Sequence, residues 1–204
     1  MIPDAANEER ILAEKAANGD IAAFETLVIR HQDRIYGVIH RLVGDLETAR
    51  DLTQETFLKA WRGISGFQGR SGFYTWLFRI ARNAVTSAGR YSAARPRVST
   101  SLGAASADDG SPGMEPVDPR ENPQELSLRE ERRELVLRAI ADLPREFREI
   151  VVLRDMDDRS YEDIAELLGI AIGTVRSRLH RARTELKQRL LKVLHPAGRP
   201  GNEQ

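Results

Sequence analysis

Hydrophobic residues recur along most of the chain at intervals of three and four positions, which is the spacing of an amphipathic α-helix. Between residues 20 and 43 these positions are Phe24, Leu27, Val28, Ile35, Val38, Ile39 and Leu42. The same spacing predicts helices at about 47–61 and around 76–85, and then at about 126–142, 145–155, 160–168 and 173–193. Because no segment shows the alternation of a β-strand, we expect an all-α fold.

Glycine followed by aspartate separates the first predicted helices. Gly19-Asp20 and Gly44-Asp45 are each typical of a helix end followed by the N-cap of the next helix. The helical spacing stops between residues 92 and 123, where Pro, Ser, Ala, Gly and Asp dominate and too little apolar surface exists to fold alone. The sequence therefore predicts two small helical domains, residues 1–95 and 126–195, with a flexible linker at 96–125 and a disordered tail at 196–204.

The second domain carries the pattern of a helix–turn–helix. Ser160 to Asp163 form a capping-box sequence at the start of a short helix, which Gly169 is suited to end. On the helix that follows, the apolar residues Val175, Leu179, Ala182 and Leu186 fall within one arc. The opposite arc and its flanks are polar or basic: Thr174, Arg176, Ser177, Arg178, His180, Arg181, Arg183, Thr184 and Lys187. This layout is typical of a recognition helix in a DNA major groove, with central side chains at base edges and flanking cations at phosphates.

The formal net charge of zero conceals two basic segments. Residues 56–95 contain seven cations and no carboxylate, and residues 170–192 contain seven cations and only Glu185. Two separate basic segments on a neutral chain favour a polyanion that is contacted at two places.

Seven of the twelve aromatic residues of the chain lie within 57–78, inside the first basic segment: Phe57, Trp61, Phe67, Phe73, Tyr74, Trp76 and Phe78. Rings stack on unpaired bases, and cations follow the backbone of a single strand. We expect Phe57, Trp61 and Trp76 in the core. Phe67, Phe73 and Tyr74 lie in or beside a glycine-containing loop, where less burial is expected and a flipped base could be held. Asn83, on the polar side of the next helix, could read a base edge.

Several classes of protein are excluded by what the sequence lacks. There is no cysteine for disulfides or thiolate metal sites, no apolar signal segment, and no run near the roughly 18 apolar residues of a membrane helix. The four histidines, His31, His40, His180 and His195, lack the spacing of metal ligands, and no motif of a catalytic nucleophile or phosphate loop is present. We expect a cytoplasmic protein that is not an enzyme and needs no cofactor, metal or small-molecule substrate.

Three long segments resemble sigma factors of bacterial RNA polymerase, in the extracytoplasmic-function (ECF) class and nearest to its sigma-E-like branch. They are GDIAAFETLV, DLTQETFLKAWRGISGFQGRSGFYTWLFRIARN and DLPREFREIVVLRDMDDRSYEDIAELLGIAIGTVRSRLHRARTEL. The resemblance covers about 170 residues in the family's order and separation. It implies a sigma region 2 bundle in the first domain and a sigma region 4 helix–turn–helix in the second. The implied function is to direct core polymerase to specific promoters by reading the −35 element and melting the −10 element.

The resemblance also implies partners and site residues. The partners are core RNA polymerase, through its β′ clamp and β flap, promoter DNA and, in many members of the class, an anti-sigma factor. The helix 51–61 would dock on the clamp through Asp51, Gln54, Glu55, Phe57, Lys59 and Trp61. The −10 strand would meet Phe67, Arg70, Phe73, Tyr74, Arg79, Arg82 and Asn83. The −35 duplex would meet Thr174, Arg176, Ser177, Arg178, His180, Arg181 and Arg183. His180 stands where some members of the class carry an aromatic ring.

Two other functions fit part of the sequence. A free-standing helix–turn–helix regulator with a helical sensor domain would have a ligand pocket in the first domain, but it leaves the acid-free aromatic segment unexplained. A decoy that sequesters polymerase, or an RNA-binding protein, would tolerate loss of the cations on the recognition helix.

Overall fold

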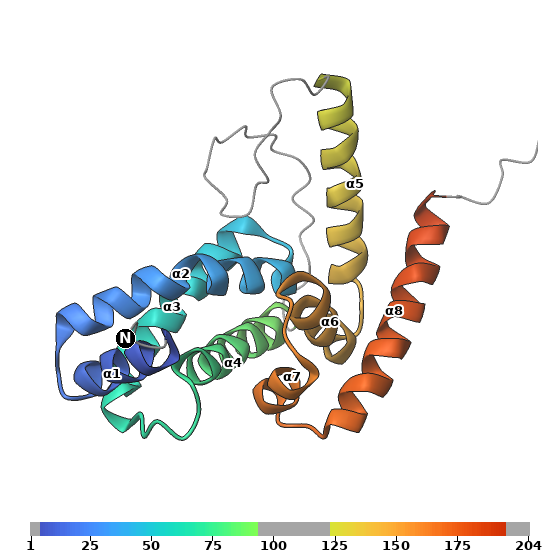
Figure 1. The fold of residues 1–204 in the computed structure, drawn as a ribbon. Coiled ribbons are helices and arrows are strands. Elements are labelled where there is room, and N and C mark those ends of the chain that lie inside the picture. Colours follow the sequence, from blue (N-terminus) through green and yellow to red (C-terminus); the bar gives the residue numbers. More distant parts are fainter. Residues whose placement is uncertain (1–4, 94–122, 195–204) are drawn as a thin grey trace, which may run out of the picture. The chain divides into compact units, whose positions relative to one another are not determined.

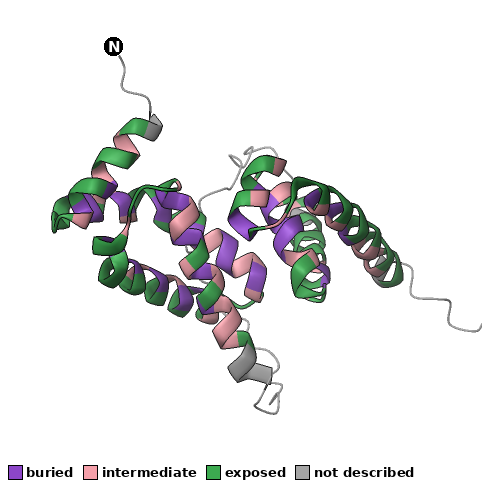
Figure 2. Ribbon diagram, turned by 90° about the horizontal axis from the view of Figure 1, so that it is seen from below, coloured by how far each residue is buried: buried purple, intermediate pink, exposed green. Residues whose placement is uncertain are grey.

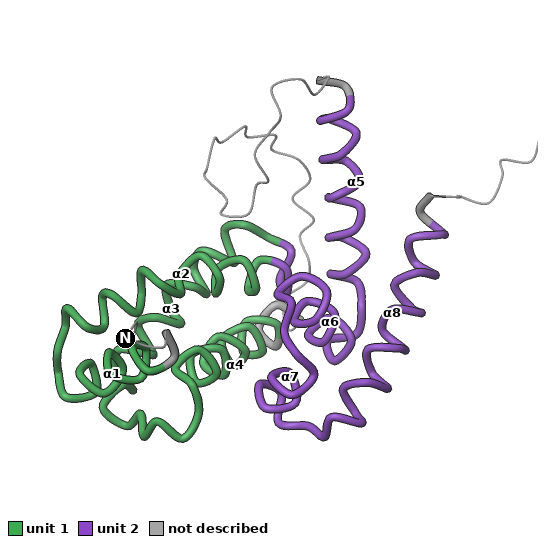
Figure 3. The backbone as a smooth tube through the Cα atoms, in the orientation of Figure 1, with its two compact units in different colours: residues 1–40, 45–117 green, residues 41–44, 118–204 purple. Residues whose placement is uncertain are grey.

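The computed structural model describes residues 5–93 and 123–194, and every regular element in these ranges is helical (Figure 1). The chain divides into two compact units, a first unit of residues 1–40 and 45–117 and a second unit of residues 41–44 and 118–204 (Figure 3). The predicted all-α fold is confirmed. Most of the predicted linker and the whole predicted tail lie outside the described residues.

The N-terminal half forms four α-helices and a short 3-10 turn: α1 (Ala5–Ala17), α2 (Ile21–Val43), α3 (Leu46–Gly63), η1 (Ile64–Gly66) and α4 (Phe73–Ala93). Both glycine–aspartate pairs act as predicted. The Asp20 carboxylate accepts a hydrogen bond from the backbone N–H of Ala23 at 3.0 Å, and Asp45 accepts one from that of Thr48 at 2.8 Å. Gly19 and Gly44 have φ of 95° and 76°, a left-handed backbone that glycine adopts readily.

The C-terminal half forms α5 (Pro123–Ala141), α6 (Arg145–Val151), a π-helical turn η2 (Val152–Met156), α7 (Tyr161–Leu168) and α8 (Ile172–Leu194). Helix α5 begins at Pro123, inside the segment predicted as linker. The predicted helix at 145–155 is divided, because the chain changes from α- to π-helical hydrogen bonding at Val152. The Asp157 N–H donates to the Val152 carbonyl, five residues back, at 2.9 Å.

Helices α7 and α8 form the predicted helix–turn–helix. The capping box is complete, because the Asp163 N–H donates to the Ser160 hydroxyl at 3.0 Å and the Ser160 N–H donates to the Asp163 carboxylate at 3.3 Å. Gly169 ends α7 in the left-handed conformation, with φ of 67°. Buried and exposed positions succeed one another along the long helices of both units, as expected for amphipathic helices (Figure 2). Within residues 5–93 and 123–194, no helix is long and apolar enough to cross a membrane.

Candidate nucleic-acid interface

Helix α8 presents the polar face that the sequence predicts. Val175, Leu179 and Ala182 are at most 2% exposed and pack into the second unit. The residues of the opposite arc are exposed: Ser177, His180, Arg181 and Thr184. Because the apolar arc fixes how the helix is rotated about its axis, this polar arc is held outward.

The cations of α8 differ in their partners. A guanidinium nitrogen of Arg178 lies 3.4 Å from a carboxylate oxygen of Glu146 on α6. Arg183 donates from Nε to Asp155 at 3.1 Å and from a terminal nitrogen to the other oxygen of the same carboxylate. These hydrogen bonds raise the pKa of Arg183 further above its ordinary value. The Arg176 guanidinium lies 5.9 Å from the centroid of the Tyr161 ring, a cation–π contact.

Neither ion pair was predicted from the sequence. Asp155 and Arg183 are 28 positions apart, and no local pattern relates them. Asp155 is one of three aspartates in the turn before the helix–turn–helix, and the sequence does not show which of them pairs with α8.

The loop before α4 differs from its prediction. Phe73 and Tyr74 are 2% and 7% exposed, whereas Trp61, expected in the core, is 38% exposed. Phe57 and Trp76 are half-buried. The expected burial was therefore wrong for Phe73, Tyr74 and Trp61. The physical reason is that Phe73 and Tyr74 form the first turn of α4 and lie against His31 on α2, with ring centroids 5.4 and 5.9 Å away.

The other residues predicted at the −10 strand are more accessible. Arg70, Arg79 and Asn83 are exposed, and Arg82 and Phe67 are half-buried. The Phe67 ring packs on Trp76 at 5.4 Å and on Phe73 at 6.0 Å, which ties the loop back to α4. This region therefore combines a cluster of aromatic side chains around the buried ring of Phe73 with exposed arginines and the exposed amide of Asn83.

A groove of ≈ 500 Å³ runs between α2 and α3. The exposed residues predicted on α3 include Asp51, Gln54, Glu55 and Lys59, and the last two form an ion pair of 2.5 Å. Phe57, Gln54 and Trp61 also line the groove, opposite Phe24, Val28, Gln32 and Tyr36 of α2. Sequence reasoning missed the α2 side, because Phe24 and Val28 were interpreted only as hydrophobic positions of a helix and Gln32 and Tyr36 showed no signal.

No group of three or more His, Cys, Asp or Glu side chains that could hold a metal ion occurs in the part of the chain that the structure describes. The structure instead shows a helix with an exposed polar and basic face, exposed cations above buried rings at the start of α4, and an apolar groove between α2 and α3.

Comparison with known proteins decides between the possible functions. Residues 27–95 match the family model of sigma-70 region 2, and residues 133–186 match that of sigma-70, region 4. The ECF RNA polymerase sigma-E factor of Escherichia coli (strain K12) is 38% identical over 190 residues, which cover 91% of this chain and 96% of that protein. This chain is an ECF sigma factor. The RNA polymerase sigma-H factor of Pseudomonas aeruginosa is 37% identical over 194 residues, covering 93% of this chain and 97% of that protein.

Solved structures of sigma factors have the same fold. CnrH, in complex with the cytosolic domain of CnrY, has a TM-score of 0.64 and 25% identity, covering 94% of this chain and 99% of CnrH. The sigma factor RpoE of Bartonella quintana, in complex with the anti-sigma factor NepR, has a TM-score of 0.61 and 28% identity, covering 85% of this chain and 99% of that chain. As a sigma factor, this protein initiates transcription at promoters and is not an enzyme. The alternative of a free-standing regulator is thereby excluded.

Proposed function

We propose that the second unit of this ECF sigma factor reads the −35 element as duplex DNA through α8, while the first unit captures the melted −10 strand. The observation that carries the proposal is the exposed polar arc of α8, held outward by Val175, Leu179 and Ala182. Within this arc Arg176 and Arg181 are placed to reach base edges, as are Thr174, Ser177 and His180. Arg178 and Arg183 flank the arc, where phosphates would lie, and Arg183 is paired there with Asp155.

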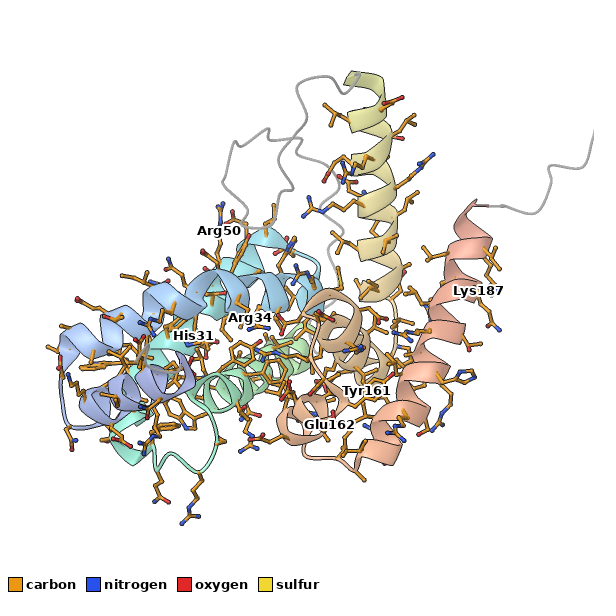
Figure 4. The ribbon with its side chains drawn as sticks, in the orientation of Figure 1. His31, Arg34, Arg50, Tyr161, Glu162 and Lys187 are labelled. Carbon is orange, nitrogen blue, oxygen red and sulfur yellow. The ribbon has the colours of Figure 1, made fainter. Side chains whose placement is uncertain are left out.

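At the −10 element, the exposed and half-buried residues contact the strand in this proposal: Phe67, Arg70, Arg79, Arg82 and Asn83. Phe73 and Tyr74 support the loop from the core of the first unit, because their rings are buried. The Arg34 guanidinium lies 4.8 Å from the centroid of the Tyr74 ring, which holds that ring from the α2 side (Figure 4). A rigid cluster of buried aromatic side chains would keep the loop in place when a nucleobase is extruded from the duplex.

Core RNA polymerase docks, in this proposal, on the groove between α2 and α3. The groove combines apolar lining with polar residues at its edge, which is the composition of a protein interface. Leu58 and Trp61 are 50% and 38% exposed although both are apolar, and a protein partner would cover them. The predicted docking residues Asp51, Gln54, Glu55, Phe57 and Lys59 lie on the same helix.

We also infer that an anti-sigma factor regulates this chain in the cytoplasm, where RNA polymerase works. CnrH and the Bartonella RpoE are described in complexes with CnrY and the anti-sigma factor NepR. This chain shares their fold and covers nearly the whole length of each.

Transcription from a promoter library tests the proposed function. The full chain is added to core polymerase, and the run-off transcripts are sequenced with and without it. We expect start sites that depend on the chain and share an upstream and a downstream element. Arg181→Ala should lose the upstream preference, whereas Arg132→Ala, an exposed cation on α5, should keep it. Start sites that are the same without the chain would overturn the proposal, and general suppression of transcripts would indicate a decoy.

A matched pair of variants tests the docking groove. Leu58→Asp places a charge in the groove and is expected to weaken capture of core polymerase at least tenfold. Ile29→Asp places the same charge at a residue of α2 that is 69% exposed and does not line the groove, so capture should be unchanged. Equal capture by both variants would exclude the groove as the docking surface.

A further inference from the structure

The four arginines on the first half of α8 fall into two pairs. Arg183 and Arg178 are held by carboxylates from the body of the second unit, Asp155 and Glu146. Arg176 and Arg181 make no ion pair with any carboxylate of the described residues. Arg181 only donates from Nε to the Ser177 carbonyl on its own helix, at 3.4 Å. The second unit therefore neutralises some of the cations beside the DNA-reading arc and leaves others available.

Asp155 holds Arg183 with the more specific geometry of the two pairs. Its two oxygens accept hydrogen bonds from two different nitrogens of one guanidinium, an arrangement that fixes both the distance and the orientation of the side chain. Asp155 belongs to the π-helical turn η2, and the side chains are 31% and 51% exposed for Asp155 and Arg183. An ion pair at this exposure contributes little to stability. The main effect of this ion pair is therefore on the orientation and the charge of the Arg183 side chain.

Other charged residues near Asp155 are already paired with one another. Arg154 lies 3.8 Å from Asp158, and Arg159 lies 2.9 Å from Asp157. Arg176 lies 5.9 Å from the centroid of the Tyr161 ring, at the start of α7 (Figure 4 labels Tyr161), and has no carboxylate partner among the described residues. A fully available Arg183 would therefore add a further cation without a carboxylate partner to α8, beside Arg176.

We propose that Asp155 is a positioning residue that withholds Arg183 from the DNA phosphates, so that promoter recognition depends on Arg176 and Arg181. The proposal rests on the proposed function of α8. Each cation that neutralises a phosphate adds affinity that is independent of sequence, and steepens the dependence of log K on log salt by about 0.9. Withholding one such contact lowers binding to all DNA by the same factor and leaves base contacts intact. The base contacts of Arg176 and Arg181 then supply a larger share of the affinity for a promoter.

The test uses the full chain assembled with core polymerase. One duplex probe is selected by the wild-type holoenzyme from a promoter library, and a second has its upstream element scrambled. Affinity for both is measured over a series of salt concentrations for wild type, Asp155→Asn, Asp155→Glu, and the double variant Asp155→Asn/Arg183→Gln. Glu131→Gln, at an exposed residue of α5, serves as the control for an equal change in charge.

Asp155→Asn is expected to steepen the salt dependence by about 0.9, because Arg183 becomes free to meet one phosphate. Its affinity should rise by the same factor for the scrambled and the selected duplex, because a phosphate contact is independent of sequence. The double variant should return to the wild-type salt dependence, Asp155→Glu should retain it, and Glu131→Gln should not change it. A role of Asp155 in folding alone would not change the salt dependence.

A double variant with a salt dependence shallower than wild type by about 0.9 would overturn the proposal, because Arg183 would then contact a phosphate in the wild type. This comparison decides the question even if Asp155→Asn alone fails to fold. An unchanged slope in a folded Asp155→Asn would also overturn it. Failure of the proposed function would be recognised by a different result. In that case Arg181→Gln would discriminate between the two duplexes as well as wild type does.

Discussion

Phe73 stands at the first position of α4, and its ring is surrounded by other rings. The centroids of His31, Trp76 and Phe67 lie 5.4, 5.7 and 6.0 Å away. Aromatic contacts at these distances add to the free energy gained by burying the ring itself. The side chain therefore joins the loop before α4 to the core of the first unit, and the loop's shape depends on it.

Phe73→Ala is expected to lower the free energy of unfolding by about 3–5 kcal/mol, because it removes a large ring that is 2% exposed. Asn83→Ala, at an exposed position on the same helix, should change it by less than about 0.5 kcal/mol. Urea denaturation of the full chain measures both. A loss of less than about 1 kcal/mol for Phe73→Ala would mean that the ring does not support the loop. A promoter-opening defect in Phe73→Ala therefore cannot by itself assign this residue to DNA binding.

The sequence predicts the exposure and the partners of some residues but not of others. The outward arc of α8 follows from helical spacing alone, because one apolar arc determines which side chains face solvent. The burial of Phe73 and Tyr74 does not follow, because it depends on where a turn of α4 meets α2. The partner of Arg183 is likewise set by the position of the π-helical turn, and the sequence does not encode that position as a local pattern.

At the scale of elements, the start of α3 depends on one carboxylate. Asp45 has extended backbone angles and accepts the N–H of Thr48, which would otherwise lack a partner in the first turn. Hydrogen bonds from Thr48 lower the pKa of the Asp45 carboxyl. Because α3 also carries the residues proposed to dock on core polymerase, the cap contributes to the position of that surface.

Asp45→Ala should lower the free energy of unfolding by about 1 kcal/mol, since alanine cannot accept the hydrogen bond from Thr48. Asp45→Asn is the matched control, because asparagine is about as good an N-cap as aspartate and should cost much less. Thermal or urea unfolding of the two variants provides the measurement. Equal losses would indicate that the charge of Asp45, rather than its hydrogen bond, stabilises α3.

Helix α1 contacts α2 through Glu9, whose carboxylate lies 3.3 Å from Nε2 of His31 (Figure 4 labels His31). The adjacent His31 imidazole lowers the pKa of Glu9 below its usual 4.5, although partial burial acts in the opposite direction. An acid with a depressed pKa in the folded state stabilises the fold above its unfolded pKa and loses this contribution as the pH falls through its folded pKa.

Glu9→Gln should therefore lower stability at pH 7 and flatten the decline of stability that the wild type shows as the pH falls below about 4.5. The measurement is the urea midpoint as a function of pH. Glu8→Gln is the matched control, because Glu8 pairs with Arg30 at 3.4 Å in a much more exposed position. If both variants keep the wild-type pH profile, the contact between Glu9 and His31 does not contribute to the attachment of α1.

Elements were predicted well where local signals exist. Caps and glycine ends fixed most boundaries of α2, α3, α7 and α8, because capping is decided within a few residues. The division of the helix after Val151 was not predicted. The residues from Ile150 to Leu153 are all buried, so their hydrophobicity has no period that could distinguish α- from π-helical hydrogen bonding.

At the scale of the whole molecule, the neutral net charge conceals two separate basic segments, one in each half of the chain. Basic residues gather on α4 and α8, and carboxylates such as Asp155 and Glu146 compensate some of them within the second unit. Because the two surfaces lie in separate units, variants in each should affect different steps of initiation. Their effects on promoter binding should also add, as expected for sites without shared partners.

Asn83→Ala and Arg181→Ala test this division in one experiment with the assembled holoenzyme. Arg181→Ala should weaken binding to closed promoter DNA by about 1–3 kcal/mol, the range for a bidentate base contact, and a pre-melted −10 segment should not relieve the loss. Asn83→Ala should form the closed complex normally but open it poorly, and the pre-melted template should recover part of its activity. The readouts are closed-complex affinity and the rate of open-complex formation. A pre-melted template that helps neither variant would exclude the melting role of the first unit, while one that rescues both equally would mean that the two units do not act on separate steps.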